Sequence, residues 1–273
     1  MPIMRRRPRN SSLRFQSFVS SEDITKKKPE KGLLTALRNS GGRNAYGRIT
    51  IRHREGGAAR KYRIIDFARQ ERNVSGVLLA VEYDPNRNVR IGLIGYENGA
   101  RRYILLPREL SIGDTIIAAE RVDAKVGNCL PLENIPVGFI VHNVGIRPES
   151  AGVFARSAGT SVEIVGKNDA HVSLKMPSGE IRMVSKRCWA TIGTLGNADY
   201  KNITWGKAGR TRYRGFRPSV RGMAKNPVDH PHGGGEGRSK SGSHPSTPWG
   251  KGCKGTRTRH RRKNSSLIVK RRK

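Results

Sequence analysis

The chain has 273 residues, with 54 Lys and Arg against 21 Asp and Glu, so its formal net charge is +33. A protein this positive repels itself unless a polyanion neutralises it, and nucleic acid binding gains affinity as each neutralised phosphate releases counterions. A membrane partner is excluded, because the sequence has no apolar run approaching about 20 residues and no basic amphipathic helix.

The positive charge is unevenly distributed along the chain. Residues 1–63 hold 17 basic and 4 acidic side chains, residues 64–200 hold 16 and 15, and residues 201–273 hold 21 and 2. The serine-rich, acid-poor N-terminus has the composition of a transit peptide, but the equally basic C-terminal end favours an RNA-binding arm. Three widely spaced cysteines give no disulfide framework and suit a reducing compartment.

The first predicted part is a basic N-terminal arm over residues 1–59. Its most distinctive segment is a glycine-rich cluster at 39–57, which is not a nucleotide phosphate loop because no Gly-Lys-Ser/Thr follows. We expect this cluster to contact RNA through Arg43, Arg48, Arg52, His53 and Arg54.

The middle of the chain is predicted to be β, because short runs rich in Val, Ile and Tyr alternate with turn residues. The expected strands are 60–67, 77–83, 89–95, 101–106 and 115–119, then 138–143, 161–165, 171–176, 180–185 and 189–194. Turns are expected at residues 84–86, 98–99 and 178–179. This spacing predicts two small barrels, at 60–124 and 125–199, with a break near 125–135. His142 and His171 fall inside strands, where a structural role is expected.

The last predicted part is an extended basic C-terminal arm over residues 200–273. Its Gly, Pro, Arg and Lys content buries too little apolar surface to fold alone, so disorder is expected without RNA. Arginines alternate with aromatic rings at 210–217, a pattern suited to phosphate neutralisation with base stacking. The candidate RNA contacts of this stretch are Trp205, Lys207, Arg210, Arg212, Tyr213, Arg214, Arg217 and Arg221.

The loop at 226–237 admits three interpretations. In a catalytic site Asp229 would orient His230 as a general base, although adjacent residues rarely face each other and no nucleophile is near in sequence. A metal site would use His230, His232, His244 and Cys253, but their spacing fits no common zinc pattern. An RNA-contact loop is favoured, because glycines let the backbone approach phosphates closely. Its candidate residues are Asn226, His230, His232, Gly233, Gly234, Gly235, Arg238 and Trp249.

Eight segments of the chain are distinctive: NPVDHPHGGGEG at 226–237, SGGRNAYGRITIRH at 40–53, YRIIDF at 62–67, EYDPNRN at 82–88, RRYILLP at 101–107, NIPVGFIVHNV at 134–144, ARSAGT at 155–160 and GKAGRTRYRGFRPSVRG at 206–222. In their sequence and in their order along the chain they resemble the ribosomal protein L2 family of the bacterial type. Together they extend from about residue 40 to residue 250.

The resemblance implies an all-β fold, an OB-like barrel followed by an SH3-like barrel with long extended basic arms. It implies a structural constituent of the large ribosomal subunit that binds large-subunit ribosomal RNA near the peptidyl transferase centre. The implied partners are this RNA, other ribosomal proteins and the small subunit across the subunit interface. Support for subunit association, tRNA binding and peptide-bond formation would be indirect.

No enzyme activity is expected, and His230 is the residue on which a catalytic role would fall. No metal or other cofactor is expected beyond Mg²⁺ bridging to RNA. The expected location is the cytoplasmic ribosome rather than an organellar one. A histidine- or metal-dependent enzyme that happens to bind RNA is the competing class, and binding of other RNAs outside the ribosome is compatible with the same surface.

Overall fold

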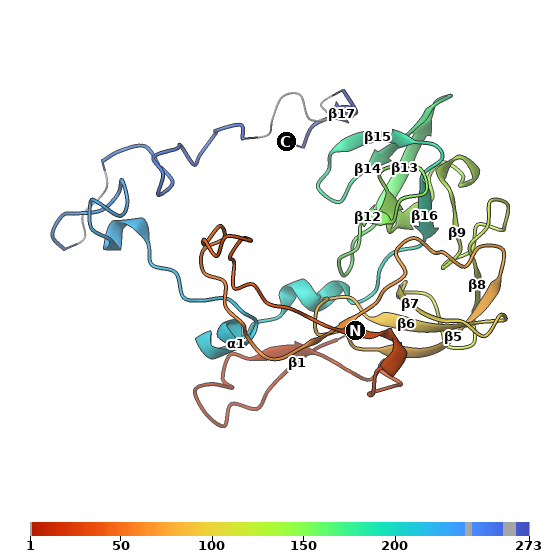
Figure 1. Ribbon diagram of the computed structural model, residues 1–273, viewed down its shortest axis with the longest axis horizontal. Coiled ribbons are helices and arrows are strands. Elements are labelled where there is room, and N and C mark those ends of the chain that lie inside the picture. Colours follow the sequence, from red (N-terminus) through yellow and green to blue (C-terminus); the bar gives the residue numbers. More distant parts are fainter. Residues whose placement is uncertain (1, 238–241, 259–265, 273) are drawn as a thin grey trace. The chain divides into compact units, whose positions relative to one another are not determined.

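The computed structural model describes residues 2–237, 242–258 and 266–272 (Figure 1). Its internal contacts divide the chain into two compact units. The first unit comprises Met1–Arg38, Ala59–Lys207 and Ser266–Lys273, and the second comprises Asn39–Ala58 and Ala208–Ser265.

A four-stranded antiparallel sheet of order β7-β6-β5-β8 forms the first part of the first unit (Figure 1). Alternate residues of a strand point to opposite faces, so Ile91 and Leu93 of β6 enter one apolar core while Ile94 and Tyr96 enter another. Burial on both faces explains the nearly continuous apolar runs of these strands. Their bounds are β5 Ser75–Glu82, β6 Ile91–Tyr96, β7 Arg101–Leu105 and β8 Thr115–Ile117.

The N-terminal residues contribute strands that the sequence did not predict. Strand β1 (Ile3–Arg5) pairs with β2 (Ser17–Val19), and β3 (Leu34–Ala36) pairs with β4 (Lys61–Arg63). The strand expected at 60–67 is therefore shorter, and only a bridge from Ile65 to Tyr103 continues it toward β7. Strands of three residues are too short for a period-two pattern to reveal them in the sequence.

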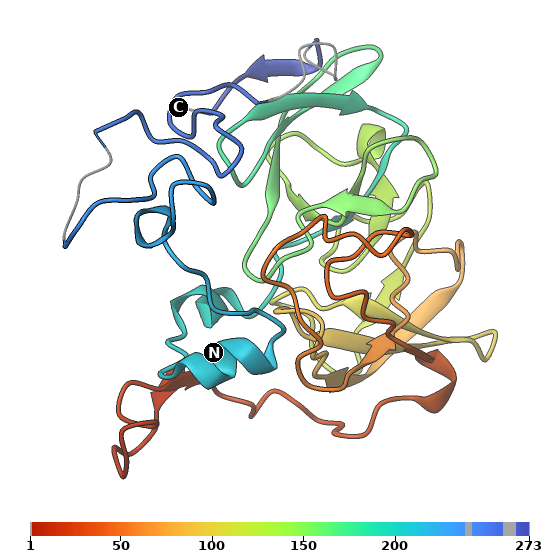
Figure 2. The same ribbon diagram turned by 60° about the vertical axis from the view of Figure 1, so that its left-hand side comes forward.

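A seven-stranded sheet of order β17-β15-β14-β13-β10-β16-β9 forms the second part of the first unit (Figures 1 and 2). Its core gathers buried residues from six of these strands, including Leu130, Val141, Ile164, Leu174 and Ile192. The bounds are β9 Cys129–Pro131, β10 Ile140–His142, β13 Val162–Lys167, β14 His171–Lys175, β15 Ile181–Ser185, β16 Trp189–Ile192 and β17 Ile268–Lys270. A separate pair joins β11 Val144–Gly145 to β12 Gly152–Phe154.

The break expected near 125–135 is wrong in one respect, because β9 lies within it and pairs with β16. Pro131 lies opposite Trp189 on an edge strand. Proline lacks a backbone N–H and is tolerated at a sheet edge. The all-β class is confirmed, and all ten predicted strands overlap an observed one.

The three predicted turns are present. Gly99 and Gly179 have φ of 80° and 83°, and each donates its N–H to the carbonyl three residues earlier, at 2.9 Å in both turns. Asp84 follows β5 and accepts the N–H of Asn86 at 2.9 Å. It also pairs with the guanidinium of Arg87, which neutralises a fully buried carboxylate.

The C-terminal residues are more regular than the predicted arm. They contain the 3₁₀ turns η3 (Ala198–Asn202) and η4 (Gly222–Ala224), the helix α1 (Ala208–Tyr213) and β17. The remaining 3₁₀ turns are η1 (Lys31–Leu33) and η2 (Leu132–Asn134). Within the part of the chain that the structure describes, no helix is long and apolar enough to cross a membrane.

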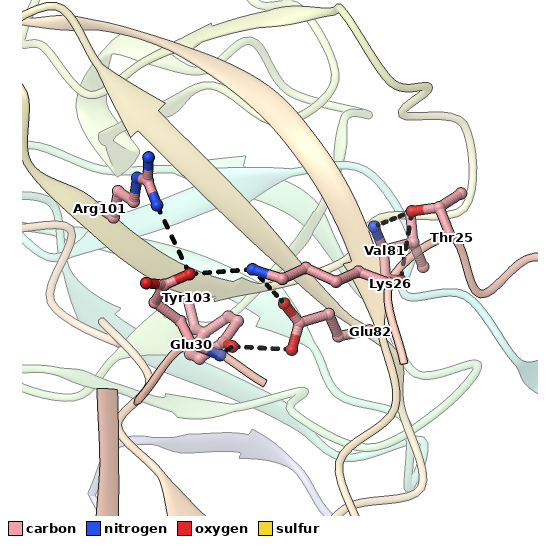
Figure 3. A network of polar contacts seen from close by, with 7 residues as sticks. All are labelled: Thr25, Lys26, Glu30, Val81, Glu82, Arg101 and Tyr103. Atoms are coloured by element: carbon pink, nitrogen blue, oxygen red, sulfur yellow. Dashed lines mark hydrogen bonds and ion pairs between the residues drawn. The ribbon is translucent and has the colours of Figure 1, made fainter. Parts of the chain in front are cut away.

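A partly buried polar network ties the N-terminal segment to the first sheet (Figure 3). The Tyr103 hydroxyl donates to Oε2 of Glu82 at 2.7 Å and accepts the backbone N–H of Glu30 at 2.8 Å. Lys26 lies between the two carboxylates, with its Nζ 2.9 Å from Glu30 and 3.8 Å from Glu82. Glu82 is only 2% exposed, and this burial raises the pKa of its carboxyl.

Candidate nucleic-acid interface

The second unit concentrates positive charge from two distant parts of the chain. By sequence it holds 19 Lys and Arg against 3 Asp and Glu. Its structure brings together the two basic, glycine-rich segments predicted to contact RNA. Most of their arginines are exposed.

Backbone hydrogen bonds join the loop at 39–58 to the segment at 211–217. Glu55 donates its N–H to Gly215 O at 3.0 Å, Ala58 donates to Tyr213 O at 2.8 Å, and Arg217 donates to His53 O at 3.1 Å. Gly57 makes the approach feasible, because a Cβ there would lie 2.7 Å from Tyr213 O and its φ is 66°. The segment at 211–217 is therefore ordered by contacts with residues that are distant in sequence.

Side-chain contacts also join the loop at 39–58 to the segment that begins at residue 211. Arg212 donates to Oε2 of Glu55 at 2.9 Å, and the Arg54 guanidinium lies 4.4 Å from the ring centroid of Phe216. The His53 ring nitrogen Nδ1 lies 3.0 Å from Pro218 O, so it carries the proton and donates to that carbonyl. Elsewhere in the unit, Arg52 lies 4.9 Å over the Trp249 ring.

Asn39 organises the start of this loop, although it was not among the residues predicted to contact RNA. Its Nδ2 donates to the carbonyls of Glu55 and Gly56 at 3.2 and 2.9 Å, while its Oδ1 accepts the N–H of Gly41 at 2.9 Å. Asn followed by Ser-Gly-Gly is a typical side-chain-capped turn. That signal indicates a turn but not the partners across it.

The loop at 226–237, which we call the histidine loop, is held in shape by its two histidine rings. Nδ1 of His230 accepts the backbone N–H of His232 at 3.0 Å, and Nε2 of His232 accepts the N–H of Ser246 at 2.8 Å. Two backbone amides are therefore satisfied by imidazole nitrogens of the loop. His230 is 8% exposed, and burial, with His232 and Lys225 nearby, lowers its pKa.

This geometry favours a positioning role for the histidines over proton transfer. Nδ1 of His230, the atom that would receive a proton, is already occupied by a backbone amide. Asp229 and His230 both donate their N–H groups to Asn226 O, at 3.0 and 3.3 Å, in one tight turn. Among residues 2–237, 242–258 and 266–272, no group of three or more His, Cys, Asp or Glu side chains is placed to hold a metal ion.

Alanine at Gly222 is expected to disorder the histidine loop. An added Cβ would lie 2.5 Å from Cε1 and Nδ1 of the His230 ring, so the ring must move and lose the His232 amide. We expect the hydrogen-exchange protection of that amide to fall about tenfold, which corresponds to about 1.4 kcal/mol. Gly209→Ala is the control, because nothing lies within 4 Å of its Cβ position. Unchanged protection in Gly222→Ala would show that the ring does not hold the loop.

The predicted site residues fall into three groups. Trp205 and Lys207 lie in the first unit, where Trp205 packs edge-on to Tyr200 at 6.2 Å. Arg238 lies outside the described residues. The second unit holds all the others: Arg43, Arg48, Arg52, His53, Arg54, Arg210, Arg212, Tyr213, Arg214, Arg217, Arg221, Asn226, His230, His232, Gly233, Gly234, Gly235 and Trp249.

Two small β structures and a strongly basic unit within one chain are typical of the class of RNA-binding β proteins. The family model of Ribosomal Proteins L2, RNA binding N-terminal domain, matches residues 30–118. That of Ribosomal Proteins L2, C-terminal domain, matches residues 125–250. The chain belongs to the ribosomal protein L2 family.

Membership of this family establishes the general function of the protein and its fold. The protein is an RNA-binding structural constituent of the large ribosomal subunit, and it resides in the ribosome with ribosomal RNA and other ribosomal proteins. The four-stranded sheet belongs to the OB-like barrel and the seven-stranded sheet to the SH3-like barrel. The boundaries expected at 59, 124 and 199 stay predictions.

Proposed function

We propose that the second unit is the main ribosomal RNA contact and that it lies near the peptidyl transferase centre. The observation that carries this is the assembly of two basic segments, Asn39–Ala58 and Ala208–Ser265, into one unit with 19 basic and 3 acidic side chains. Such a unit repels itself in isolation, and RNA phosphates supply the missing countercharge.

In this proposal the protein supports peptide-bond formation, tRNA binding and subunit association indirectly, as a non-catalytic component. The histidine loop presents a backbone shaped by glycines, and His230 and His232 fix that shape by accepting amides. RNA positioned by the loop would do the chemistry, because rate acceleration by positioning needs a rigid frame. Contact with the small subunit, Mg²⁺ bridging between loop and RNA, and a cytoplasmic rather than organellar ribosome complete the proposal.

The C-terminal arm contains a natural attachment point for a chemical probe of nearby RNA. Cys253 is exposed, whereas Cys129 and Cys188 are buried. An iron chelate attached to the natural Cys253 would therefore generate hydroxyl radicals only beside the tail. In reconstituted large subunits we expect RNA cleavage to cluster around the peptidyl transferase centre.

The matched control is Cys253→Ser treated with the same reagent, which should give no specific cleavage. Cleavage confined to RNA remote from the peptidyl transferase centre would contradict the proposed location. That result would still be consistent with RNA binding by the protein.

A further inference from the structure

A basic cleft in the second unit has a composition that phosphate neutralisation alone does not explain. Two adjoining hollows of about 420 and 570 Å³ share Gly41, Arg43, Arg54 and Arg217. Volumes of about 300–1,000 Å³ are typical of small-ligand sites. We call these hollows together the arginine cleft.

The charge of the arginine cleft selects an anion. Four arginines line its larger hollow, and none of the described residues in that lining has a carboxylate side chain. Glu55 lines the smaller hollow, but Arg212 engages its carboxylate at 2.9 Å. Arg43 uses one N–H on Gly41 O at 2.8 Å, which leaves further donors of its five-donor fork.

One wall of the larger hollow is apolar. Ile49 and Ile51 line it and are 59% and 57% exposed. The backbone that carries them is held in place, because Thr50 and Ile51 both donate their N–H groups to Gly42 O, at 2.9 and 3.2 Å. Two exposed isoleucines beside arginines favour a ligand that carries an apolar face together with its negative charge.

A nucleotide has that combination, with a phosphate for the guanidinium groups and a base for the isoleucine wall. A paired base within a helix keeps both faces stacked, so only an unpaired base swung out of its helix could reach the wall. We propose that the arginine cleft binds one extruded, unpaired nucleotide of the ribosomal RNA. This inference rests on the proposed function, since it assumes that the second unit contacts RNA.

The test compares two RNA hairpins with the same stem, one fully paired and one with a single bulged 2-aminopurine nucleotide. The full-length protein is expected to bind the bulged hairpin about tenfold more tightly, because the base and the isoleucines bury apolar surface against each other. The 2-aminopurine fluorescence is expected to change on binding. The double substitution Ile49→Thr and Ile51→Thr should abolish both the preference and the fluorescence change while the paired hairpin still binds.

Charge is tested separately with Arg217→Gln, which should weaken binding of the bulged hairpin more than that of the paired one. Lys254→Gln removes the same charge from the second unit outside the lining of the cleft and should weaken both equally. Equal affinity of the unsubstituted protein for both hairpins, or a preference that survives loss of the isoleucines, would overturn the cleft as a nucleotide site while RNA binding stands. If neither hairpin binds, the proposed function fails and this inference fails with it.

Discussion

Replacing Glu82 with alanine is expected to lower the free energy of unfolding by about 3 kcal/mol, from an unpaired buried hydroxyl and a cavity. The change leaves the Tyr103 hydroxyl, which donates to Glu82 at 2.7 Å, without its acceptor (Figure 3). Tyr103 is fully buried, so water cannot replace the lost oxygen without structural change. Urea unfolding at neutral pH measures the difference.

Glu82→Gln is the matched control, because its amide oxygen still accepts from Tyr103. Burial is the largest cause of the raised pKa of Glu82, so its charge is unfavourable in the folded protein. The stabilisation linked to a raised carboxyl pKa is fully present below the unfolded value of 4.5 and is lost as the pH rises through the folded value. At neutral pH we therefore expect Glu82→Gln to be at least as stable as the unsubstituted protein. A loss as large as that of Glu82→Ala would show that the Lys26 ion pair, not the tyrosine, dominates.

Acidification from about pH 7.5 to about pH 4.5 is expected to cost about 2.5 kcal/mol of stability through His142 alone. This side chain is buried, and its Nδ1 donates to Gly193 O at 2.8 Å. Burial lowers its pKa from 6.5 to about 4. The unfolded chain takes up a proton below about 6.5 while the folded protein resists until about 4, so stability falls as the pH falls through that window.

His142→Gln removes this titration, and a glutamine amide could donate to the same carbonyl. Subtracting the variant's profile of stability against pH from that of the unsubstituted protein cancels the contribution of the carboxylates that both proteins share. We expect the difference to grow steadily below about pH 6.5. Parallel profiles over the whole range would mean that His142 does not stay neutral in the folded protein.

The strands and turns were predictable because their signals are local. Val77 to Val81 and Ile91 to Ile94 show apolar runs bounded by turn residues, and the turn at Gly99 needs only its own neighbours. Strand β9 was hidden by Pro131, whose edge position depends on sheet order. Strand β17 is three residues long and pairs with β15, from which it is distant in sequence.

The candidate site was predictable in its residue types but not in its arrangement. Composition identified the arginines and the histidine loop. It could not show that Arg54 and Phe216 meet, because that contact closes a loop of more than 150 residues. Nor could it show that His230 accepts an amide, since the two ring nitrogens are distinguished only by their partners.

We propose above all that the second unit binds ribosomal RNA through its arginines. The most direct measurement is the salt dependence of binding to large-subunit RNA fragments and to random RNA of matched composition. It would be made for the full-length protein and for a variant with Gln at Arg210, Arg212, Arg214 and Arg217. Each phosphate contact contributes about 0.7 to 0.9 to the slope of log K against log salt concentration. We predict a clear preference for the subunit RNA, with both the affinity and the slope reduced in the variant. Equal binding of both RNAs, with a slope unchanged by the four substitutions, would contradict the claim.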